Sequence, residues 1–272
     1  MTRTKLLLVV LAASASACAG GGAARSPARD IRLPPGARMV DLTYPFDERT
    51  LYWPTSPSGF VLESLSHGTT PGGYFYAANK LSAPEHGGTH LDAPIHFAEG
   101  KATTEAVPLS RLVAPAVVID ITRKASADAD ALLVPEDLAA FEAAHGPIER
   151  GTIVLVRTGW AERWPDRKRY FGDDTPGDAS RLHFPGIGAA AARLLVERQI
   201  AAAGIDTASI DHGPSTDFQA HRTLFAADIP AFENLTSLSD VPARGALVVA
   251  LPMKIAGGSG GPLRVIAIVP AN

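Results

Sequence analysis

Apolar runs of strand length recur from residue 117 to the C-terminal end, separated by segments rich in Gly, Pro and polar residues. Several of these runs are dominated by Val and Ile. Short continuous apolar runs between turn residues are typical of strands that are buried on both faces. We therefore predict strands at 117–121, 153–156, 205–210, 246–251 and 263–269.

Two helices are predicted between these strands. Residues 135–146 begin with Pro and acidic residues and end in Gly, an order that is typical of a short helix. Residues 188–203 are rich in Ala and Leu with an apolar spacing of three and four, and Gly204 follows as a C-cap. Together with the strands on either side, the second helix forms a predicted βαβ unit, so we expect a mixed α/β fold.

A long polar segment at 158–186 interrupts this alternation. Long loops that carry aromatic side chains often border ligand sites. The aromatic residues of this segment that we single out are Trp160, Trp164, Tyr170 and Phe171.

The N-terminal segment differs in character from the rest of the chain. Basic residues precede an apolar run too short to span a bilayer, and small residues follow, which indicates a signal peptide over residues 1–17. Cys18 stands where a bacterial lipobox has its lipidated cysteine; ordinary secretion with cleavage near Ala17 is the alternative. Residues 18–38 are rich in Gly, Ala, Pro and Arg and predict a flexible tether. We expect an exported, membrane-anchored lipoprotein of the periplasm or cell surface.

Composition and charge narrow the class of protein. Of the 272 residues, 46% are hydrophobic and 19% are charged, which is too apolar for an intrinsically disordered chain. The net charge of −3 and the lack of a basic run argue against a nucleic-acid partner. A single Cys excludes an internal disulfide framework and a Cys-based zinc cluster. No second linker or repeat follows Met39, so residues 39–272 are treated as one domain.

The stretch richest in chemistry is H-G-G-T-H-L-D-A-P-I-H at residues 86–96, which holds three of the eight His and one Asp. Neutral imidazole and carboxylate groups suit divalent zinc or manganese. A His-rich surface loop is the alternative, but such loops rarely combine Gly-Gly, His-x-Asp and Pro in one run of low charge. The motif therefore predicts metal binding.

The spacing within this motif constrains its geometry. On a helix, His86 and His90 would share a face while Asp92 falls about 120° away, and Gly87-Gly88 disfavours a helix. On a straight strand His86 and His90 would lie ~13 Å apart, too far for one metal. A bend at Gly87-Gly88, where glycine permits backbone angles that other residues avoid, would let the chain wrap an ion.

His221 and Glu233, twelve residues apart, form a second candidate pair. Alone the pair is a weak signal, because a buried His or a Glu at a helix end would look the same. Polar residues precede it at or beyond the carboxyl end of a predicted strand, where ligand sites of α/β sheets occur. These residues are Asp206, Asp211, His212 and Asp217.

Residues 86–96 fill every position of the signature H-x-G-T-H-x-D-x-P-x-H, and here the chain resembles the cyclase family of metal-dependent hydrolases. That family includes bacterial kynurenine formamidase and isatin hydrolase. The resemblance extends over essentially residues 39–272. It is carried further by Asp41-Leu42-Thr43, Trp53-Pro54, Phe184-Pro185-Gly186, Gly204-Ile205-Asp206-Thr207, the spacing of His221 and Glu233, and Pro252-Met253-Lys254.

The resemblance implies a set of metal ligands. His86, His90 and Asp92 look like the ligands of a first metal. In formamidase-like members Asp92 would bridge to a second metal held by His221 and Glu233. The implied cofactor is a divalent metal, Zn or Mn, as one or two ions.

The implied activity is hydrolysis of an amide-like, non-peptide C–N bond in a cyclic or aryl amide, such as isatin or formylkynurenine. The metal would lower the pKa of bound water toward ~7, and His96 looks like the acid/base that moves a proton to the leaving nitrogen. The implied fold is mixed α/β with a barrel-like central sheet and flanking helices, and members are usually oligomers. Thr55 follows Trp53-Pro54 where formamidases usually have Gly, so arylformamidase proper is kept as the alternative activity.

Two other classes of function remain open at this point. A non-catalytic surface lipoprotein could bind a metal or small ligand, although it would have no use for a free His96. Residues 257–261 match the G-x-S-x-G elbow of serine hydrolases around Ser259. That elbow requires a following helix, whereas Pro262 and a predicted strand follow here.

Aromatic residues surround the metal motif in the sequence. Most are expected to lie in the core, and one or two to line an aromatic substrate pocket. The candidates for substrate contact are Trp53, Phe60 and Tyr74.

Overall fold

The computed structural model describes residue 33 and residues 35–271. The predicted signal peptide and residues 18–32 of the predicted tether lie outside the described residues. Within the part of the chain that is described, no helix combines the length and the apolar character needed to cross a membrane.

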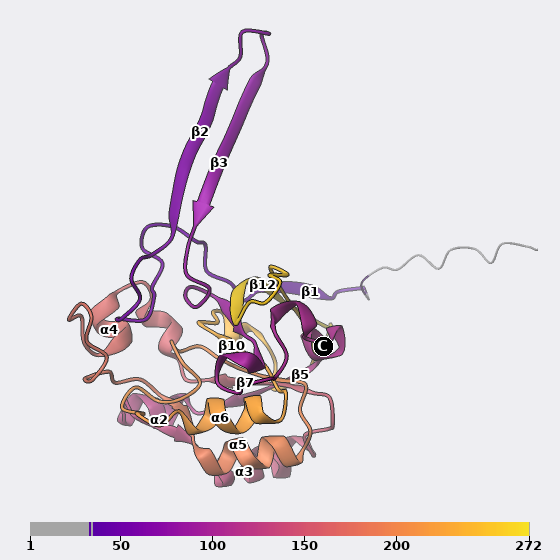
Figure 1. The fold of residues 1–272 in the computed structure, drawn as a ribbon. Helices are drawn as coiled ribbons and strands as arrows, with labels where there is room; N and C mark the ends of the chain where they lie inside the picture. The colour runs from indigo at the N-terminus through magenta and orange to yellow at the C-terminus, as the bar shows by residue number, and fades with distance from the viewer. Residues whose placement is uncertain (1–32, 34, 272) are drawn as a thin grey trace, which may run out of the picture. The chain divides into compact units, whose positions relative to one another are not determined.

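The fold is built on an eight-stranded mixed sheet in the order β1-β12-β11-β5-β7-β9-β10-β4 (Figure 1). β12 pairs with β4 near its start and with β1 near its end, and the β12–β4 pairing closes the sheet into a barrel-like ring. This confirms the expected mixed sheet with a barrel-like centre. The strands are β1 (Arg38–Asp41), β4 (His90–Asp92), β5 (Val113–Asp120), β7 (Ile153–Arg157), β9 (Ala202–Ile205), β10 (Ala231–Glu233), β11 (Arg244–Pro252) and β12 (Gly260–Val269).

Alternate residues of the central strands enter two different cores. On β5, Ala116 and Val118 lie in the barrel interior, whereas Val117 and Ile119 pack against the helices. The next strand, β7, divides its residues in the same way. Burial on both faces explains why these strands are continuous apolar runs in the sequence.

Helices α3, α5 and α6 lie together on one side of the sheet (Figure 1). They contribute eight buried side chains to the second core. The predicted helix at 135–146 is confirmed as α3, and Gly146 follows it with a φ of 84°. The helices are α1 (Leu109–Leu112), α2 (Thr122–Ala127), α3 (Pro135–His145), α4 (Arg167–Phe171), α5 (Ala189–Glu197) and α6 (Gln219–Ala226), with short 3-10 helices η1 (Pro94–His96), η2 (Thr104–Ala106), η3 (Trp160–Arg163) and η4 (Leu238–Asp240).

The predicted βαβ unit is present, but its boundaries were wrong. β7 and β9 are parallel neighbours, and α5 lies between them in the chain. α5 ends at Glu197 rather than at 203, because Gln199 has a φ of 54° and the chain turns there. The strand accordingly starts earlier and ends at Ile205, since Ala-rich residues 201–203 fit a buried strand as well as a helix.

The aromatic segment 158–186 is more ordered than a loop, since it contains η3, α4 and the short strand β8 (Gly186–Ile187), which pairs with β6 (Leu132–Leu133). Its aromatic residues build a third apolar cluster with Leu51, and Trp53 packs against that cluster. The buried aromatic members are Trp160, Tyr170, Phe171 and Phe184.

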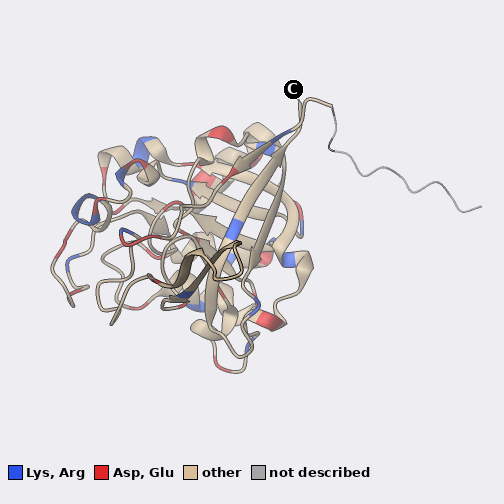
Figure 2. Ribbon diagram, turned by 90° about the horizontal axis from the view of Figure 1, so that it is seen from above, with Lys and Arg blue, Asp and Glu red and all other residues tan. Residues whose placement is uncertain are grey.

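A long two-stranded hairpin, formed by β2 (Val61–Thr69) and β3 (Phe75–Ser82), was not predicted. It projects from the remainder of the fold (Figure 1), and its two strands form a separate sheet. Viewed along a perpendicular direction, charged residues of both signs are spread around the fold (Figure 2).

Candidate active site

The short strand β4 lies where the barrel closes, between β10 and β12. Leu91, at its centre, is fully buried in the barrel interior. Because strand side chains alternate, His90 and Asp92 point to the other face. On β10, Glu233 lies opposite His90 in the strand register and reaches the same face.

A bend at Gly87-Gly88 brings His86 back to this group, as the sequence predicted. Gly88 has a φ of 56°, and a Cβ there would lie 2.6 Å from the ring of Phe46. A Cβ at Gly87 would lie 2.1 Å from the Tyr52 ring. The bend places Nδ1 of His86 2.7 Å from Oδ1 of Asp92, so one carboxylate meets residues from both sides of the turn.

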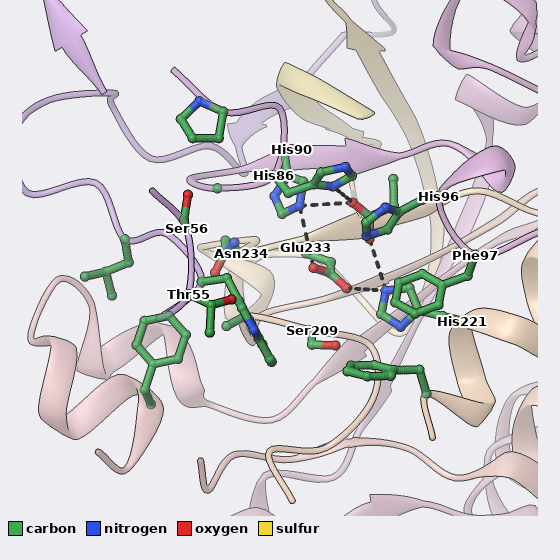
Figure 3. A pocket seen from close by; sticks show the side chains of 18 residues that line it. Thr55, Ser56, His86, His90, His96, Phe97, Ser209, His221, Glu233 and Asn234 are labelled. Carbon is green, nitrogen blue, oxygen red and sulfur yellow. Dashed lines mark hydrogen bonds and ion pairs between the residues drawn. The ribbon is translucent and has the colours of Figure 1, made fainter. Parts of the chain in front are cut away.

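His221 comes from α6 and completes the cluster from the opposite side (Figure 3). Asp211 fixes it: its carboxylate accepts hydrogen bonds from the backbone N–H groups of Ala220 and His221, at 2.9 and 3.1 Å. The other contact of this carboxylate is with Nδ1 of His221 at 2.7 Å. Asp211 therefore both caps the start of the helix and sets the direction of the imidazole ring.

Four buried groups then meet within a few ångströms. Nε2 of His221 lies 3.1 Å from Oδ2 of Asp92 and 3.2 Å from Oε1 of Glu233. Nε2 of His90 lies 3.1 Å from Oδ1 of Asp92 and 3.6 Å from Oε2 of Glu233. The sequence-predicted ligands from residues 86–92 and 221–233 thus share one site.

The protonation of this site is set by burial and by the two carboxylates. Burial alone would lower the pKa of His90, but the charges of Asp92 and Glu233 raise it to about 9. The pKa of His221 is raised well above its usual value against the same burial effect, by hydrogen bonds to Asp211 and Asp92. Burial would raise the pKa of Asp92, but neighbouring His residues hold it well below its usual range.

The hydrogen bonds of His90, Asp92 and Glu233 show that these side chains fit a divalent cation. Nδ1 of His90 lies 2.9 Å from the carbonyl of Gly88, which can only accept, so the ring proton is on Nδ1. The lone pair of Nε2 then faces two carboxylates, and this buried nitrogen has no hydrogen-bond partner among the described residues. Lone pairs facing carboxylate oxygens require a cation or an extra proton between them. Imidazole nitrogen and carboxylate oxygen atoms are common ligands of Zn and Mn ions in proteins.

Two groups of three side chains have ligand atoms within 4.8 Å of one another. One consists of His90, Asp92 and Glu233, and the other of His86, Asp92 and His96. Asp92 belongs to both, which agrees with a bridging carboxylate. The grouping differs from the one implied by the family resemblance, which placed His86 with His90 and left His96 outside the ligands.

His96 ends the 3-10 helix η1 and stacks on His86, with ring centroids 3.8 Å apart and an angle of 19° between the planes. Burial, as the largest effect, lowers the pKa of His96 to about 4. Its imidazole is therefore neutral at physiological pH. A neutral imidazole beside the cluster can accept a proton.

The cluster opens into a cavity of about 320 Å³. Apolar and aromatic side chains form one wall, and small polar groups such as Thr55, Ser209 and Asn234 complete it (Figure 3). No Lys or Arg occurs among the described residues that line the cavity. The apolar wall consists of Leu51, Trp53, Phe97, Phe171 and Phe218.

Of the predicted substrate-contact residues, only Trp53 lines this cavity. Phe60 instead packs against Phe46, with ring centroids 5.8 Å apart. Tyr74 lies at the turn of the β2–β3 hairpin and is 64% exposed. The sequence singled out Phe171 only as part of the aromatic segment at 158–186. No pattern in the sequence around Phe218 indicates that it lines the cavity.

Ser259 lies beside the cluster, directly before β12. Its hydroxyl oxygen is 2.9 Å from Nε2 of His86 and 2.6 Å from a carboxylate oxygen of Glu85. The order Asp92, His86, Ser259 is that of a serine-hydrolase triad. However, Ser259 is not among the residues that line the cavity, and a strand rather than a helix follows it.

Known proteins share this architecture. A family model described as “Putative cyclase” matches residues 40–212. Isatin hydrolase of Roseibium aggregatum is 35% identical over 206 residues, which cover 73% of this chain and 77% of that protein. Kynurenine formamidase of Polaromonas naphthalenivorans is 30% identical over 231 residues, covering 84% of this chain and 90% of that one.

Among solved structures, the fold is similar to an isatin hydrolase bound to the product analogue thioisatinate. The TM-score is 0.79 at 31% sequence identity, and the match covers 87% of this chain and 94% of that one. The similarity therefore extends over most of both chains.

Proposed function

The chain belongs to the cyclase family of metal-dependent hydrolases, and on that premise we propose that it opens the lactam ring of a planar, uncharged aromatic substrate of the isatin type. It is a hydrolase of amide C–N bonds that acts on a small molecule. The proposed substrate is based on the lining of the cavity. Aromatic side chains face the His and carboxylate cluster, and the described lining contains no Lys or Arg that could pair with a substrate carboxylate.

Formylkynurenine would suit this cavity less well. That substrate carries an α-carboxylate and an α-ammonium group, and the described lining provides no cation for the former. Thr55, which stands where formamidases usually have Gly, contributes its side chain to the lining. Arylformamidase activity is therefore the second candidate, supported by the similarity to kynurenine formamidase rather than by the cavity.

Different residues of the cluster have different roles in the proposed reaction. His90, Asp92 and Glu233 would hold a divalent cation, which we propose to be Zn or Mn as one or two ions. Such a cation supplies Lewis acidity, lowering the pKa of a water toward ~7 and polarising a carbonyl. Asp211 keeps His221 directed at the carboxylates.

His96 is the group that moves protons in this proposal. Its neutral imidazole lines the cavity and accepts a proton from the attacking water. Attack at the carbonyl carbon forms the new C–O bond and breaks the C–N bond of the lactam. The imidazolium then returns the proton to the leaving nitrogen, which yields an aryl amine and a carboxylate.

The substrate is tested by measuring kcat/KM of the purified, metal-loaded protein for isatin, formanilide and an aryl lactone. We expect isatin to exceed formanilide by at least tenfold. A preference for formanilide would favour the arylformamidase alternative. Turnover of no amide or lactone by metal-replete protein would instead support a non-catalytic binding protein.

Chelation separates the metal mechanism from the serine-hydrolase alternative. We expect prolonged chelation to abolish isatin hydrolysis and Zn or Mn to restore it. Ser259→Ala should retain turnover and its sensitivity to chelators. If Ser259→Ala is inactive and the parent protein ignores chelators, the Asp92–His86–Ser259 alignment is the catalytic one.

We also propose that the protein is exported, anchored by lipid on Cys18 and assembled as a homo-oligomer. The support for the anchor is the sequence before and at Cys18. Cys18→Ala should move the protein from the membrane fraction to the soluble fraction, because a lipid would be its anchor. A parent protein that is soluble and carries Cys18 without lipid would contradict this.

A further inference from the structure

The glycine-rich segment 257–261, which matches a serine-hydrolase elbow in sequence, has no role in the proposed reaction. Its central residue, Ser259, lies beside His86 rather than in the lining of the cavity. The backbone carbonyl of Ser259 accepts a hydrogen bond from the N–H of Ala93 at 2.9 Å, and the preceding carbonyl accepts one from the N–H of Thr104 at 2.9 Å. The position of the hydroxyl relative to the cluster is therefore fixed from two sides.

A hydrogen bond to Glu85 sets the direction of the hydroxyl proton of Ser259. The hydroxyl oxygen lies 2.6 Å from Oε2 of Glu85, and the backbone N–H of Ser259 donates to the same carboxylate oxygen at 3.0 Å. A carboxylate can only accept, so the hydroxyl donates to Glu85 and keeps its lone pairs for other donors. Nε2 of His86, which lies 2.9 Å from this hydroxyl oxygen, therefore carries a proton and donates it to Ser259.

This hydrogen bond decides the tautomer of His86. With the proton on Nε2, the neutral ring has its lone pair on Nδ1. Nδ1 lies 2.7 Å from Oδ1 of Asp92, the carboxylate that belongs to both ligand groups. His86 thus presents Nδ1 to Asp92, whereas His90 presents Nε2. The ring nitrogen that binds a metal is commonly set by the hydrogen bond of the other nitrogen.

The glycines on either side of Ser259 leave room for its two partners. A Cβ at Gly258 would lie 2.8 Å from Oε1 of Glu85, and a Cβ at Gly260 would lie 2.6 Å from Cε1 of His86. Both distances are shorter than a normal non-bonded contact, so a larger residue would displace the carboxylate or the imidazole. Glycine is thus required here at the two variable positions of the G-x-S-x-G pattern, which an elbow leaves free.

We propose that Glu85 and Ser259 are positioning residues, which hold His86 in the tautomer protonated on Nε2 and so direct Nδ1 at a cation shared with Asp92. The hydrogen bonds run from Nε2 through the Ser259 hydroxyl to the Glu85 carboxylate. The carbonyl of Gly88 does the same for the other ring nitrogen of the second imidazole in the motif. The inference rests on the proposed cation site and is independent of the identity of the substrate.

The same contacts argue against Ser259 as a nucleophile. In a serine hydrolase the hydroxyl donates to the histidine, which then removes its proton. Here the direction is reversed, because the hydroxyl donates to Glu85 and accepts from His86. Nε2 of His86 then has no lone pair with which to activate the hydroxyl.

Metal titration of single and double variants tests the proposal on the full-length protein. The dissociation constant for Zn²⁺ should rise about 10–100-fold in Glu85→Ala and in Ser259→Ala, as loss of a hydrogen-bond partner of a metal-binding His commonly does. The double variant should match the weaker of the two single variants, because both changes act through Nε2 of His86. Parental affinity in both single variants would overturn the inference, and so would effects that multiply in the double variant.

Two further variants separate positioning from a general loss of local structure. Glu105 accepts a hydrogen bond from the N–H of Gly257 at 3.0 Å, in the same glycine segment, so Glu105→Ala loosens the segment and should leave Zn²⁺ affinity unchanged. Glu85→Gln keeps a carbonyl oxygen that can accept from Ser259, and it should recover most of the affinity lost in Glu85→Ala. An equal loss in Glu105→Ala, or no recovery in Glu85→Gln, would overturn the inference.

Nuclear magnetic resonance measures the tautomer in the parent protein. With ¹⁵N-labelled histidine and bound Zn²⁺, we expect the ring proton of His86 on Nε2 and that of His90 on Nδ1. The signals of His86 are identified by their loss in His86→Gln. A proton on Nδ1 of His86 would overturn the inference.

The outcomes distinguish this inference from the proposed cation site and from serine chemistry. A parent protein that binds no metal would overturn both the site and the inference. A parent that binds Zn²⁺ no more tightly than the Glu85→Ala and Ser259→Ala variants would overturn the inference alone. Loss of isatin turnover in Ser259→Ala at parental metal affinity would also overturn it, and would assign the hydroxyl as the nucleophile.

Discussion

The buried cluster of His and carboxylate residues and the β2–β3 hairpin depart in opposite directions from the usual rule that polar groups lie outside and apolar groups inside. The cluster buries two carboxylates and two imidazoles, of which Asp92 is 1% exposed. The hairpin exposes Leu, Tyr and Phe side chains by 50% or more. Each arrangement is costly for an isolated chain.

The comparison shows that each exception points to a missing partner of matching chemistry. Buried carboxylates facing imidazole lone pairs call for a cation, which replaces the lost hydration of the charged groups. Exposed apolar side chains on a hairpin without net charge call for an apolar protein surface. The two regions should therefore respond independently: changes in the cluster should alter metal content and turnover, and changes in the hairpin should alter assembly.

The largest expected effect is on His96, which touches the cluster without being one of its fully buried members. His96→Ala should lower kcat by about 10²–10⁴-fold, the usual contribution of a general acid or base. Metal content and melting temperature should stay at the parent values because His90, Asp92 and Glu233 remain. Loss of metal in this variant would assign His96 as a ligand, as its grouping with His86 and Asp92 allows.

Glu233 and His221 test whether distant parts of the chain build one cluster. Glu233→Gln or His221→Ala should reduce metal content or turnover at least tenfold, because each removes a group directed at the shared site. Elemental analysis and kcat/KM check this, with light scattering expected to show an unchanged mass. Two variants equal to the parent in both readouts would make the pair purely structural.

Asp211 should give a smaller effect, because it acts through His221. Asp211→Asn removes the charge that orients this imidazole and should weaken metal affinity about tenfold. The exposed Asp217 in the same loop provides the matched control, and Asp217→Asn should change nothing. Metal titration measures the difference. Equal affinity in both variants would reduce Asp211 to a helix cap.

The smallest effect is expected for the charges of the hairpin. Lys80 and Glu63 are 64% and 57% exposed, and exposed ion pairs contribute little to stability. Lys80→Met should therefore shift the melting temperature by less than about 2 °C and leave the mass unchanged. A larger shift, or dissociation, would show that the charged face of the hairpin also lies in an interface.

The sequence singled out part of the cluster because His86, His90 and Asp92 are concentrated in one short motif. The residue types of 86–96 and the need for a bend at Gly87-Gly88 follow from coordination chemistry and strand geometry alone. Strands β5, β7, β11 and β12 were found because they form largely apolar runs in the sequence. The short strands β1, β4 and β10, of three or four residues each, were not predicted. His221 and Glu233 carried a weak signal by themselves and depended on the family resemblance.

Other features left no readable pattern. The hairpin at 61–82 was not predicted because both of its faces are exposed. Its strands therefore show no alternation of buried and exposed residues. Phe60 and Tyr74 are near the motif in sequence but not in the cavity, whereas Phe171 and Phe218 reach it from distant segments. Closeness to the motif in sequence therefore did not predict which side chains line the cavity, because its apolar wall comes from four separate parts of the chain.

The most direct test of the account is the metal content of the purified protein, measured together with its turnover of isatin. We predict one or two divalent ions per chain in the parent, and chelated protein without metal should be inactive until Zn or Mn is added back. Asp92→Asn should bind no metal, because Asp92 belongs to both ligand groups. Full activity in protein shown by elemental analysis to be free of metal would contradict the account.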